Sequence, residues 1–137
     1  VQAVDTNKLS LGSTINNVIR EFECDPIILQ IKPGCHVPWH KDLSPKRKCV
    51  INVPLYEYTD NYTFFIDHPD ADTGKGFLGH IPYLVPYTYK KLTLLNVSGK
   101  HHCVFNCTNE PRFLFSIQFP TASYHQMLDY FDSLTSK

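Results

Sequence analysis

The middle of this 137-residue chain consists of short apolar segments separated by turn residues. The segments are rich in β-branched and aromatic residues, and turn sequences such as Lys32-Pro33-Gly34 and Thr59-Asp60-Asn61 punctuate them. The pattern predicts seven strands, at Ile27–Ile31, Cys49–Tyr58, Tyr62–Ile66, Ile81–Tyr89, Leu92–Leu95, Cys103–Cys107 and Arg112–Phe119. Seven short strands in so short a stretch indicate a mainly β fold, either a sandwich or a jelly-roll barrel.

Two helices are expected to flank these strands. Apolar side chains recur three and four residues apart over residues 14–23, which predicts a helix with Ser13 as its N-cap. The same spacing predicts a second helix over about residues 122–134. The stretch Asp67–His80 has no clear period and is expected to form a long loop, of a kind that often acts as a lid. We expect one domain over residues 1–137, with its core at about 26–120.

The composition excludes several classes of protein. Lys and Arg total 13 and Asp and Glu total 13, and a neutral chain is a poor ligand for a nucleic-acid backbone. No apolar run is long enough to span a membrane, and nothing at the start resembles a signal peptide, although a first residue of Val1 is compatible with a partial chain. An odd number of cysteines without short paired spacing predicts mostly buried, reduced thiols and a cytoplasmic protein.

Two histidines and an aspartate have the spacing of a metal site. His40 and Asp42 lie two residues apart, so their side chains point the same way in an extended segment. This pair alone is common by chance, but His102 follows sixty residues later. Two imidazoles and one carboxylate with open coordination positions are the ligands of non-haem Fe(II) oxygenases, whereas structural zinc prefers four protein ligands. The three residues therefore predict a metal centre.

The neighbouring His101 is the alternative distal ligand. Alternation places His102 on one face of the expected strand with Val104 and Asn106, and His101 on the other. This arrangement favours His102 as the ligand. The histidines at positions 68, 80 and 125 have no partner pattern and are expected to be surface or packing residues.

Arg112 opens the last strand, ten residues after His102. A charged residue in such an aromatic segment is costly to bury unless an anion pairs with it. The guanidinium fork suits a ligand carboxylate because it binds both oxygens. Pairing with Glu110 or Asp129 is the alternative.

The combination of these residues resembles the Fe(II)/2-oxoglutarate-dependent dioxygenases. Members of that superfamily have a double-stranded β-helix, which is a cupin-like jelly roll, and carry H-x-D/E, a distal His and a basic residue that binds the 2-oxoglutarate C5 carboxylate. The resemblance covers about residues 31–120 and is nearest to aspartyl/asparaginyl β-hydroxylase-type domains and small phage oxygenases. It is carried by Pro33-Gly34, His40-x-Asp42, Val50-Ile51-Asn52-Val53-Pro54-Leu55, His102-x-Val104-x-Asn106 and Arg112.

The resemblance implies specific roles for individual residues. His40, Asp42 and His102 match the metal ligands, and Arg112 matches the anchor of the C5 carboxylate. Asn52 falls where β-hydroxylase-type members place a polar contact to 2-oxoglutarate, a His in an R-x-H-x-P-L pattern. Ser116 lies on the Arg112 face and is expected to help hold the same carboxylate. Apart from the resemblance, the candidates for a substrate pocket are His36, Trp39 and Asn106, and the alternative for His36 is an ordinary loop histidine.

The chain also departs from the β-hydroxylase pattern. Val50 replaces the Arg of R-x-H-x-P-L, and Arg47 is the nearby basic residue that would substitute for it. Asp42 is present, although several β-hydroxylases lack a carboxylate ligand. A complete ligand set argues against halogenation, which needs that coordination position for halide.

The implied activity is hydroxylation of a C–H bond, with Fe(II), 2-oxoglutarate and O2 as cofactors. The resemblance points to an amino-acid side chain of a protein or peptide, of the Asp, Asn or Pro type. From the neutral charge and the lack of a long apolar run we expect no nucleic-acid or membrane partner. Two alternatives remain: an oxygenase acting on a small metabolite, and a cupin-like module that binds a metal or ligand without turnover. The presence of Arg112 argues against the cupin-like binding module, because a simple metal-binding module needs no carboxylate anchor. If the protein is viral, its location would be the host cytoplasm.

Overall fold

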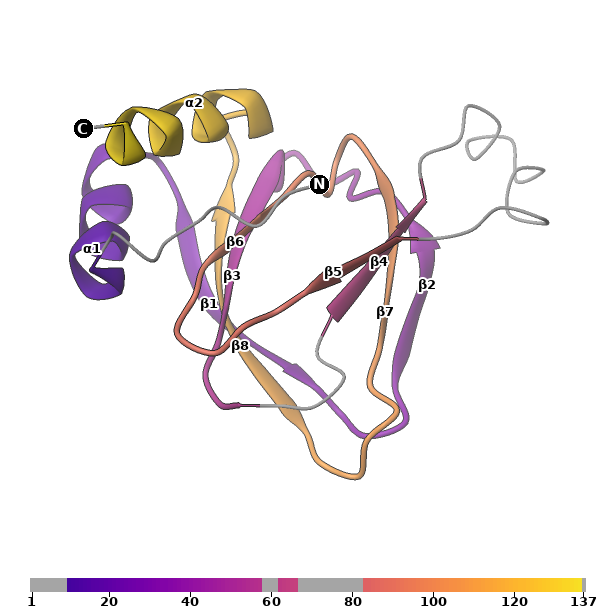
Figure 1. The fold of residues 1–137 in the computed structure, drawn as a ribbon. Coiled ribbons are helices and arrows are strands. Elements are labelled where there is room, and N and C mark those ends of the chain that lie inside the picture. The colour runs from indigo at the N-terminus through magenta and orange to yellow at the C-terminus, as the bar shows by residue number, and fades with distance from the viewer. Residues whose placement is uncertain (1–9, 58–61, 67–82, 137) are drawn as a thin grey trace.

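The computed structural model describes residues 10–57, 62–66 and 83–136 (Figure 1). Helix α1 spans Leu11–Glu21 and helix α2 spans Tyr124–Thr135. Between them lie β1 (Asp25–Ile31), β2 (His36–His40), β3 (Cys49–Pro54), β4 (Tyr62–Ile66), β5 (Tyr83–Pro86), β6 (Thr93–Leu95), β7 (His101–Phe105) and β8 (Arg112–Phe119). None of the helices in these ranges is long and apolar enough to cross a membrane.

The strands form two four-stranded sheets. The first has the order β1-β8-β3-β6 and the second the order β2-β7-β4-β5, and every pair is antiparallel. The chain passes repeatedly from one sheet to the other, so strands distant in sequence become neighbours (Figure 1). The expectation of a mainly β fold with flanking helices is confirmed, in the form of a small sandwich of two antiparallel sheets.

The first sheet has an apolar cluster on each of its faces. Alternation along β3 sends Cys49, Ile51 and Val53 toward the helices, where they pack with side chains such as Phe131 of α2. Val50, between them, points the other way into a second cluster with residues of the opposite sheet. All six residues of β3 are therefore buried, and the strand joins the helical layer to the space between the sheets.

A tight turn takes the chain from β1 in the first sheet to β2 in the second. Cys35 N donates to Lys32 O at 3.1 Å, and Gly34 adopts φ 72°, a conformation that glycine tolerates and other residues rarely adopt. Gly34 N donates to Asn106 O at 2.8 Å, and Asn106 N donates to Cys35 O at 2.9 Å. Asn106 thus opposes two residues at once, which is the pattern of a β-bulge.

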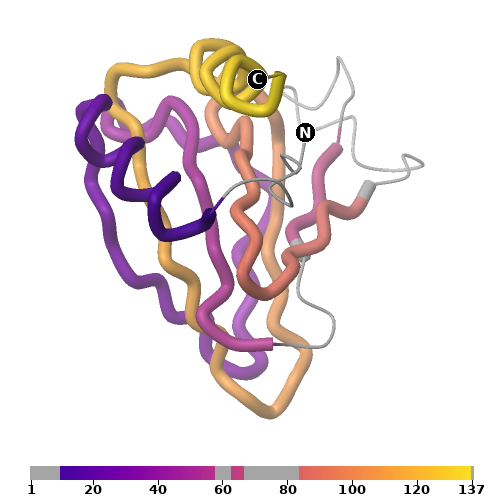
Figure 2. Tube along the Cα trace, turned by 60° about the vertical axis from the view of Figure 1, so that its left-hand side comes forward, coloured from indigo at the N-terminus to yellow at the C-terminus, as the bar shows by residue number. Residues whose placement is uncertain are grey.

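The Asn106 side chain ties this turn to the β7–β8 turn, which projects from the lower end of the molecule (Figure 2). Its Nδ2 donates to Ile31 O at 2.9 Å and to Glu110 O at 2.8 Å. Its Oδ1 accepts from Thr108 N at 3.1 Å and from Thr108 Oγ1 at 2.6 Å. Asn106 is 1% exposed, and all its side-chain hydrogen-bonding groups are used within the protein.

The helices and strands differ from the sequence prediction in several places. Helix α1 begins about one turn earlier than predicted, with Ser10 at the N-cap, so the assignment of Ser13 was wrong. Leu11 packs on the apolar cluster, which extends the helix toward the N-terminus. Strand β2 was missed because His36 and Pro38 interrupt the apolar alternation of this largely exposed edge strand. The predicted strand Cys49–Tyr58 ends at Pro54. The predicted strand Ile81–Tyr89 ends at Pro86, and its first two residues lie outside the described part of the chain.

The sequence also led to predictions about the loop Asp67–His80 and about the burial of the five cysteines. The loop Asp67–His80 lies outside the described residues. All five cysteines are free thiols, but only Cys49 and Cys103 are buried, and Cys35 and Cys107 are exposed. The expectation of mostly buried thiols was therefore wrong for the two residues that lie beside the bulge at Asn106.

Replacing Asn106 by Ala is expected to lower the free energy of unfolding by about 2 kcal/mol, because Ile31 O and Glu110 O lose their donor and Thr108 loses its acceptor. Urea denaturation followed by circular dichroism measures the loss. Asn16→Ala, on an exposed position of α1, is the matched control and should change stability by less than about 0.5 kcal/mol. Equal stabilities of the two variants would contradict the structural role of Asn106.

Candidate metal centre

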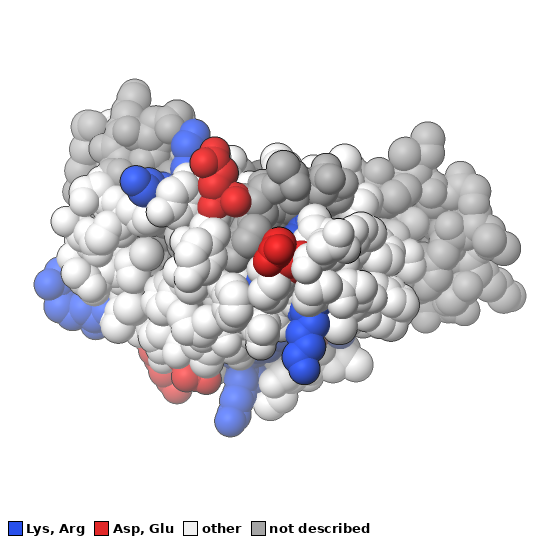
Figure 3. All heavy atoms as spheres, turned by 90° about the horizontal axis from the view of Figure 1, so that it is seen from below, with Lys and Arg blue, Asp and Glu red and all other residues white. Residues whose placement is uncertain are grey.

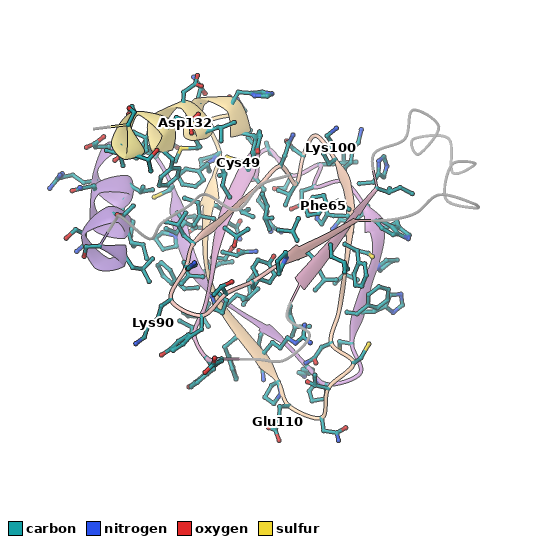
Figure 4. The ribbon with its side chains drawn as sticks, viewed as in Figure 1. Cys49, Phe65, Lys90, Lys100, Glu110 and Asp132 are labelled. Atoms are coloured by element: carbon teal, nitrogen blue, oxygen red, sulfur yellow. The ribbon has the colours of Figure 1, made fainter. Side chains whose placement is uncertain are left out.

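Strand pairing brings the three predicted ligands together. His40 ends β2 and is the register partner of His102 in β7. Asp42 follows two residues after the strand, where its backbone N–H donates to Val97 O at 2.9 Å. His102 is also the register partner of Phe65 in β4, which Figure 4 labels together with Lys100, the residue just before β7. The site therefore lies at the Lys100 end of the second sheet.

The side chains of these residues converge on one point. Asp42 Oδ1 lies 3.2 Å from His40 Nε2 and 3.7 Å from His102 Nε2. One ligand atom from each residue lies within 4.8 Å of the other two, and in the described parts of the chain this is the one cluster of its kind. The cluster includes His102 and not His101, as alternation predicts. Its geometry fits a divalent ion held by two imidazoles and one carboxylate.

Hydrogen bonds from the backbone set the orientation of both imidazoles. His40 Nδ1 lies 2.6 Å from Pro38 O, and His102 Nδ1 lies 3.1 Å from Lys100 O. A carbonyl can only accept, so each Nδ1 carries the proton and donates it. In the neutral ring the lone pair is then on Nε2, the atom that faces the cluster. Metal-binding histidines are commonly fixed in this way by a second hydrogen bond.

Burial differs among the three ligands. The side chain of His102 is 5% exposed and that of Asp42 is 8% exposed, whereas that of His40 is 34% exposed. Burial lowers the pKa of His102 and outweighs the opposing effects of the Lys100 hydrogen bond and the Asp42 carboxylate. A neutral imidazole is the form that binds a metal. Access to the centre is therefore from the His40 side.

A cavity of about 70 Å³ adjoins the centre, between the two sheets. Seven of its lining side chains are Leu, Ile or Val, which form a largely apolar wall. Its polar lining residues are Arg47, Asn52, Thr63, Tyr87 and His102. A mostly apolar cavity with a few convergent polar groups is the usual form of a small-molecule site.

Polar groups from both sheets meet in the cavity. The Tyr87 hydroxyl shares a hydrogen bond of 2.6 Å with Thr63 Oγ1 and accepts one of 3.0 Å from Asn52 Nδ2. Burial raises the pKa of Tyr87, so this hydroxyl is protonated at neutral pH. Asn52 Oδ1 and the Oγ of Ser116, its register partner in β8, are buried with no hydrogen-bond partner among the described residues. Asn52 lines the cavity and Ser116 does not, so the Asn52 oxygen is the orphaned atom that fits a polar ligand there.

Arg112 is the residue predicted to anchor a ligand carboxylate. It begins β8, at the end of the first sheet that is distant from His40, Asp42 and His102. It is 2% exposed, and its Nη1 donates to Phe105 O at 3.2 Å. Its register partner in β1, Ile31, lines the cavity, as does Leu114 two residues further along β8, but Arg112 itself does not. The guanidinium therefore lies next to the end of the cavity that is distant from the metal ligands.

The residues predicted near a substrate pocket do not gather around the centre. His36 is exposed, and its ring stacks on that of Phe105 with centroids 5.4 Å apart, on the face of β7 opposite to His102. Trp39 is half-buried directly before His40. Asn106 is committed to the two turns described above. Their roles toward a substrate stay predictions.

Sequence reasoning missed two of the cavity residues, Thr63 and Tyr87, and named Arg47 only as a substitute. Arg47 Nη1 lies 3.2 Å from Asp42 Oδ2, which makes it the salt-bridge partner of the carboxylate ligand. The short spacing from Asp42 to Arg47 is the only signal in the sequence for this contact. Nothing in the sequence connects Thr63 or Tyr87 with the histidines, because each comes from a different strand or turn.

No protein-family model matches the sequence, and no curated protein matches it. Among solved structures, an oxidoreductase of the 2OG-Fe(II) oxygenase family from Burkholderia pseudomallei superposes with a TM-score of 0.51 at 16% identity, covering 80% of this chain and 57% of that one. A non-haem monooxygenase, ThoJ in complex with nickel, gives a TM-score of 0.41 at 18% identity, covering 70% and 42%. The chain spans less than two thirds of either protein. At these identities the first likeness supports the fold, a small cupin-like sandwich, and the second is too distant to add to it.

Replacing Asp42 or His102 by Ala is expected to weaken Mn(II) binding at least about 100-fold, because loss of a ligand costs more than loss of a group that merely orients one. Isothermal titration calorimetry on the metal-free protein measures this. His125→Ala, on an exposed position of α2, should leave Mn(II) affinity unchanged. Undiminished binding in both ligand variants would rule out the assigned metal centre.

Proposed function

We propose that the protein is a non-haem Fe(II)- and 2-oxoglutarate-dependent dioxygenase built on a double-stranded β-helix, a form of jelly roll. The observation that carries the proposal is the convergence of His40, Asp42 and His102 with both imidazole Nε2 atoms directed at the same carboxylate oxygen. The cavity beside them and the fold of the Burkholderia oxidoreductase support it.

The donor set fits ferrous iron. His40 Nε2, Asp42 Oδ1 and His102 Nε2 would hold the ion and leave positions open for other ligands. Bound there, iron supplies activation of O2 coupled to oxidative decarboxylation of 2-oxoglutarate to succinate. The chain contributes coordination geometry, through the Pro38 and Lys100 carbonyls that hold the rings, and a partly shielded site.

The cavity fits the carbon chain of 2-oxoglutarate. Its apolar wall excludes water from the methylene groups, and its polar residues offer hydrogen bonds to the oxygens. Arg112, beside the distant end at Ile31, would bind the C5 carboxylate. The orphaned Ser116 hydroxyl would donate to that carboxylate from β8, and Asn52 of β3 would donate the second N–H of its Nδ2, the first being bonded to Tyr87.

The proposed substrate is an amino-acid side chain of a protein or peptide. The partial exposure of His40 supports this, because the centre opens to the surface on that side and a chain can approach it there. Asp, Asn and Pro side chains are the candidates that the sequence resemblance offers. Incubation with a host peptide library, followed by a mass-spectrometric search for products heavier by one oxygen, identifies the substrate.

The test of the function is the dependence of 2-oxoglutarate binding on metal. With Mn(II) present, 2-oxoglutarate should raise the melting temperature, and without a metal it should not. With Fe(II), ascorbate and O2, the protein should then form succinate, and His102→Ala should form none. Stabilisation without any succinate would identify a binding module, and the absence of stabilisation would rule out the co-substrate.

Substitution of Arg112 by Lys should weaken 2-oxoglutarate binding at least about tenfold, because Lys keeps the charge but loses the two-pronged contact to a carboxylate. Binding of 2-oxopentanoate, which lacks the C5 carboxylate, should be the same in both proteins. Calorimetry on the Mn(II)-loaded proteins gives both affinities. An equal loss for the two acids would assign Arg112 a purely structural role.

A further inference from the structure

We infer that the outer edge of β1 binds a second copy of this chain, through antiparallel pairing of β1 with the same strand of that copy. The first sheets of the two copies would then form one continuous sheet across the contact. The metal centre belongs to the second sheet, so this contact does not depend on the proposed function.

Among the described strands, β1 is the sheet edge that lacks protection against pairing (Figure 1). The other edges are short, buried or interrupted: β6 has three buried residues, β5 has four and ends at Pro86, and β2 contains Pro38 and a register shift. β1 has seven residues and pairs with β8 in unbroken register. Lysine, proline and bulges are the features that keep edges apart, and Ile27–Ile31 contains none of them.

The backbone of β1 presents alternate residues to the outside. Phe113 O in β8 accepts from Leu55 N on the β3 side at 3.0 Å, so the odd-numbered residues of β8 bond toward β3 and the even-numbered ones toward β1. The even-numbered residues are in register with odd-numbered residues of β1. The N–H and C=O groups of Ile28 and Gln30 therefore point away from the sheet, as does Pro26 O. They have no hydrogen-bond partner among the described residues.

Two copies of this edge are complementary when Leu29 lies on a two-fold axis. Ile28 of one copy is then opposite Gln30 of the other, and each residue of this pair donates one hydrogen bond and accepts one. The axis repeats the same pair on its other side, as in any contact between identical surfaces. The four outward amide groups of the strand centre are thus all used.

The ends of the edge fit the same register. Pro26 is opposite Lys32 of the second copy, and the Lys32 N–H, which points outward by the same alternation, donates to Pro26 O. Pro26 has no N–H to donate in return. Lys32 O does not need that donor, because it already accepts from Cys35 N at 3.1 Å. The one missing donor therefore lies opposite an acceptor that is already occupied.

The side chains also match in this register. On the cavity side of the sheet Leu29 meets Leu29 of the second copy, and Ile27 meets Ile31. On the opposite face, Ile28 is 58% exposed and would be covered in part by Gln30 of the second copy. The pairs beside the axis on the cavity side are thus apolar, and the contact removes an exposed isoleucine from water.

Charge complementarity favours a second copy running antiparallel over another occupant. Asp25 begins β1 and Lys32 follows its end, and both are exposed. Antiparallel pairing brings Asp25 of each copy to within one residue of Lys32 of the other. A strand edge is narrower than the roughly 800 Å² per partner of stable complexes, so we expect a reversible dimer with a dissociation constant on the order of 10 µM.

The first experiment is sedimentation velocity of the protein from about 1 to 200 µM, a range that brackets the expected dissociation constant. The wild type should pass from monomer to dimer. Ile28→Lys should weaken association at least about tenfold, because it places a lysine on each side of the axis. Leu84→Lys is the matched control: Leu84 is 51% exposed on β5, an edge of the other sheet, and its replacement should change association less than about twofold.

A charge exchange tests the direction of pairing. Lys32→Glu and Asp25→Lys should each weaken association about threefold, because each places like charges close together. The double variant Asp25→Lys/Lys32→Glu should restore it. Parallel pairing would place like charges together in the wild type as well, so it predicts no such restoration.

Amide hydrogen exchange followed by NMR locates the contact. The amides of Ile28 and Gln30 should exchange quickly in dilute protein and slowly at high concentration. Those of Ile27 and Leu29 bond to β8 and should be protected at both concentrations.

Each result has a definite consequence. A wild type that stays monomeric at about 200 µM would overturn the inference, because the expected dissociation constant lies well below that concentration. A dimer that Ile28→Lys leaves intact, or that Leu84→Lys weakens as much, would place the contact on another surface and overturn it too. Circular dichroism checks that each variant is folded. If Ile28→Lys is not, the charge variants at the exposed ends of β1 decide the question.

Discussion

The antiparallel pairing of β2 with β7 is the interaction on which the metal centre depends. It places His40 opposite His102. The register shifts between Val37 and His40, and such irregularities near functional sites change the direction in which a strand projects its side chains. The other end of the same pair is held by the turn at Gly34 and by the buried side chain of Asn106. The β2–β7 pair therefore has the turn at Gly34 and the side chain of Asn106 at one end and the candidate metal centre at the other.

The position of the helices explains why polar groups can occupy the space between the sheets. Helices α1 and α2 cover the outer face of the first sheet and form a complete apolar cluster there (Figure 1). The inner face can then include Asn52 and Ser116, each with an oxygen that has no partner among the described residues and costs about 1–3 kcal/mol when no ligand meets it. Groups retained at such a cost are more consistent with ligand binding than with packing. Strand β3 supplies both faces, so the stability of the core and the geometry of the cavity are not independent.

The described charged side chains are scattered, and the proposed ligand binding depends on the few that surround Asp42. The chain is neutral as a whole, and the described residues on the face shown in Figure 3 carry scattered charges of both signs. Around the centre, one carboxylate, Asp42, lies between two imidazoles and the Arg47 guanidinium. Addition of a divalent ion would make this group strongly positive, and a small dianion is the ligand that such a site favours.

The sequence by itself determined the mainly β fold, both helices and seven strand positions. It also singled out His40, Asp42 and His102, which the structure brings together. These features are local or periodic: alternation, helical spacing and turn residues act over a few positions and can be read along the chain. It did not determine β2, because an exposed edge strand with Pro38 in it has little apolar pattern. Nor did it determine the roles of Arg47, Thr63 and Tyr87. Tyr87 meets Asn52 across 35 residues and Thr63 across 24, and only the packing of one sheet on the other decides which of these side chains face the same cavity.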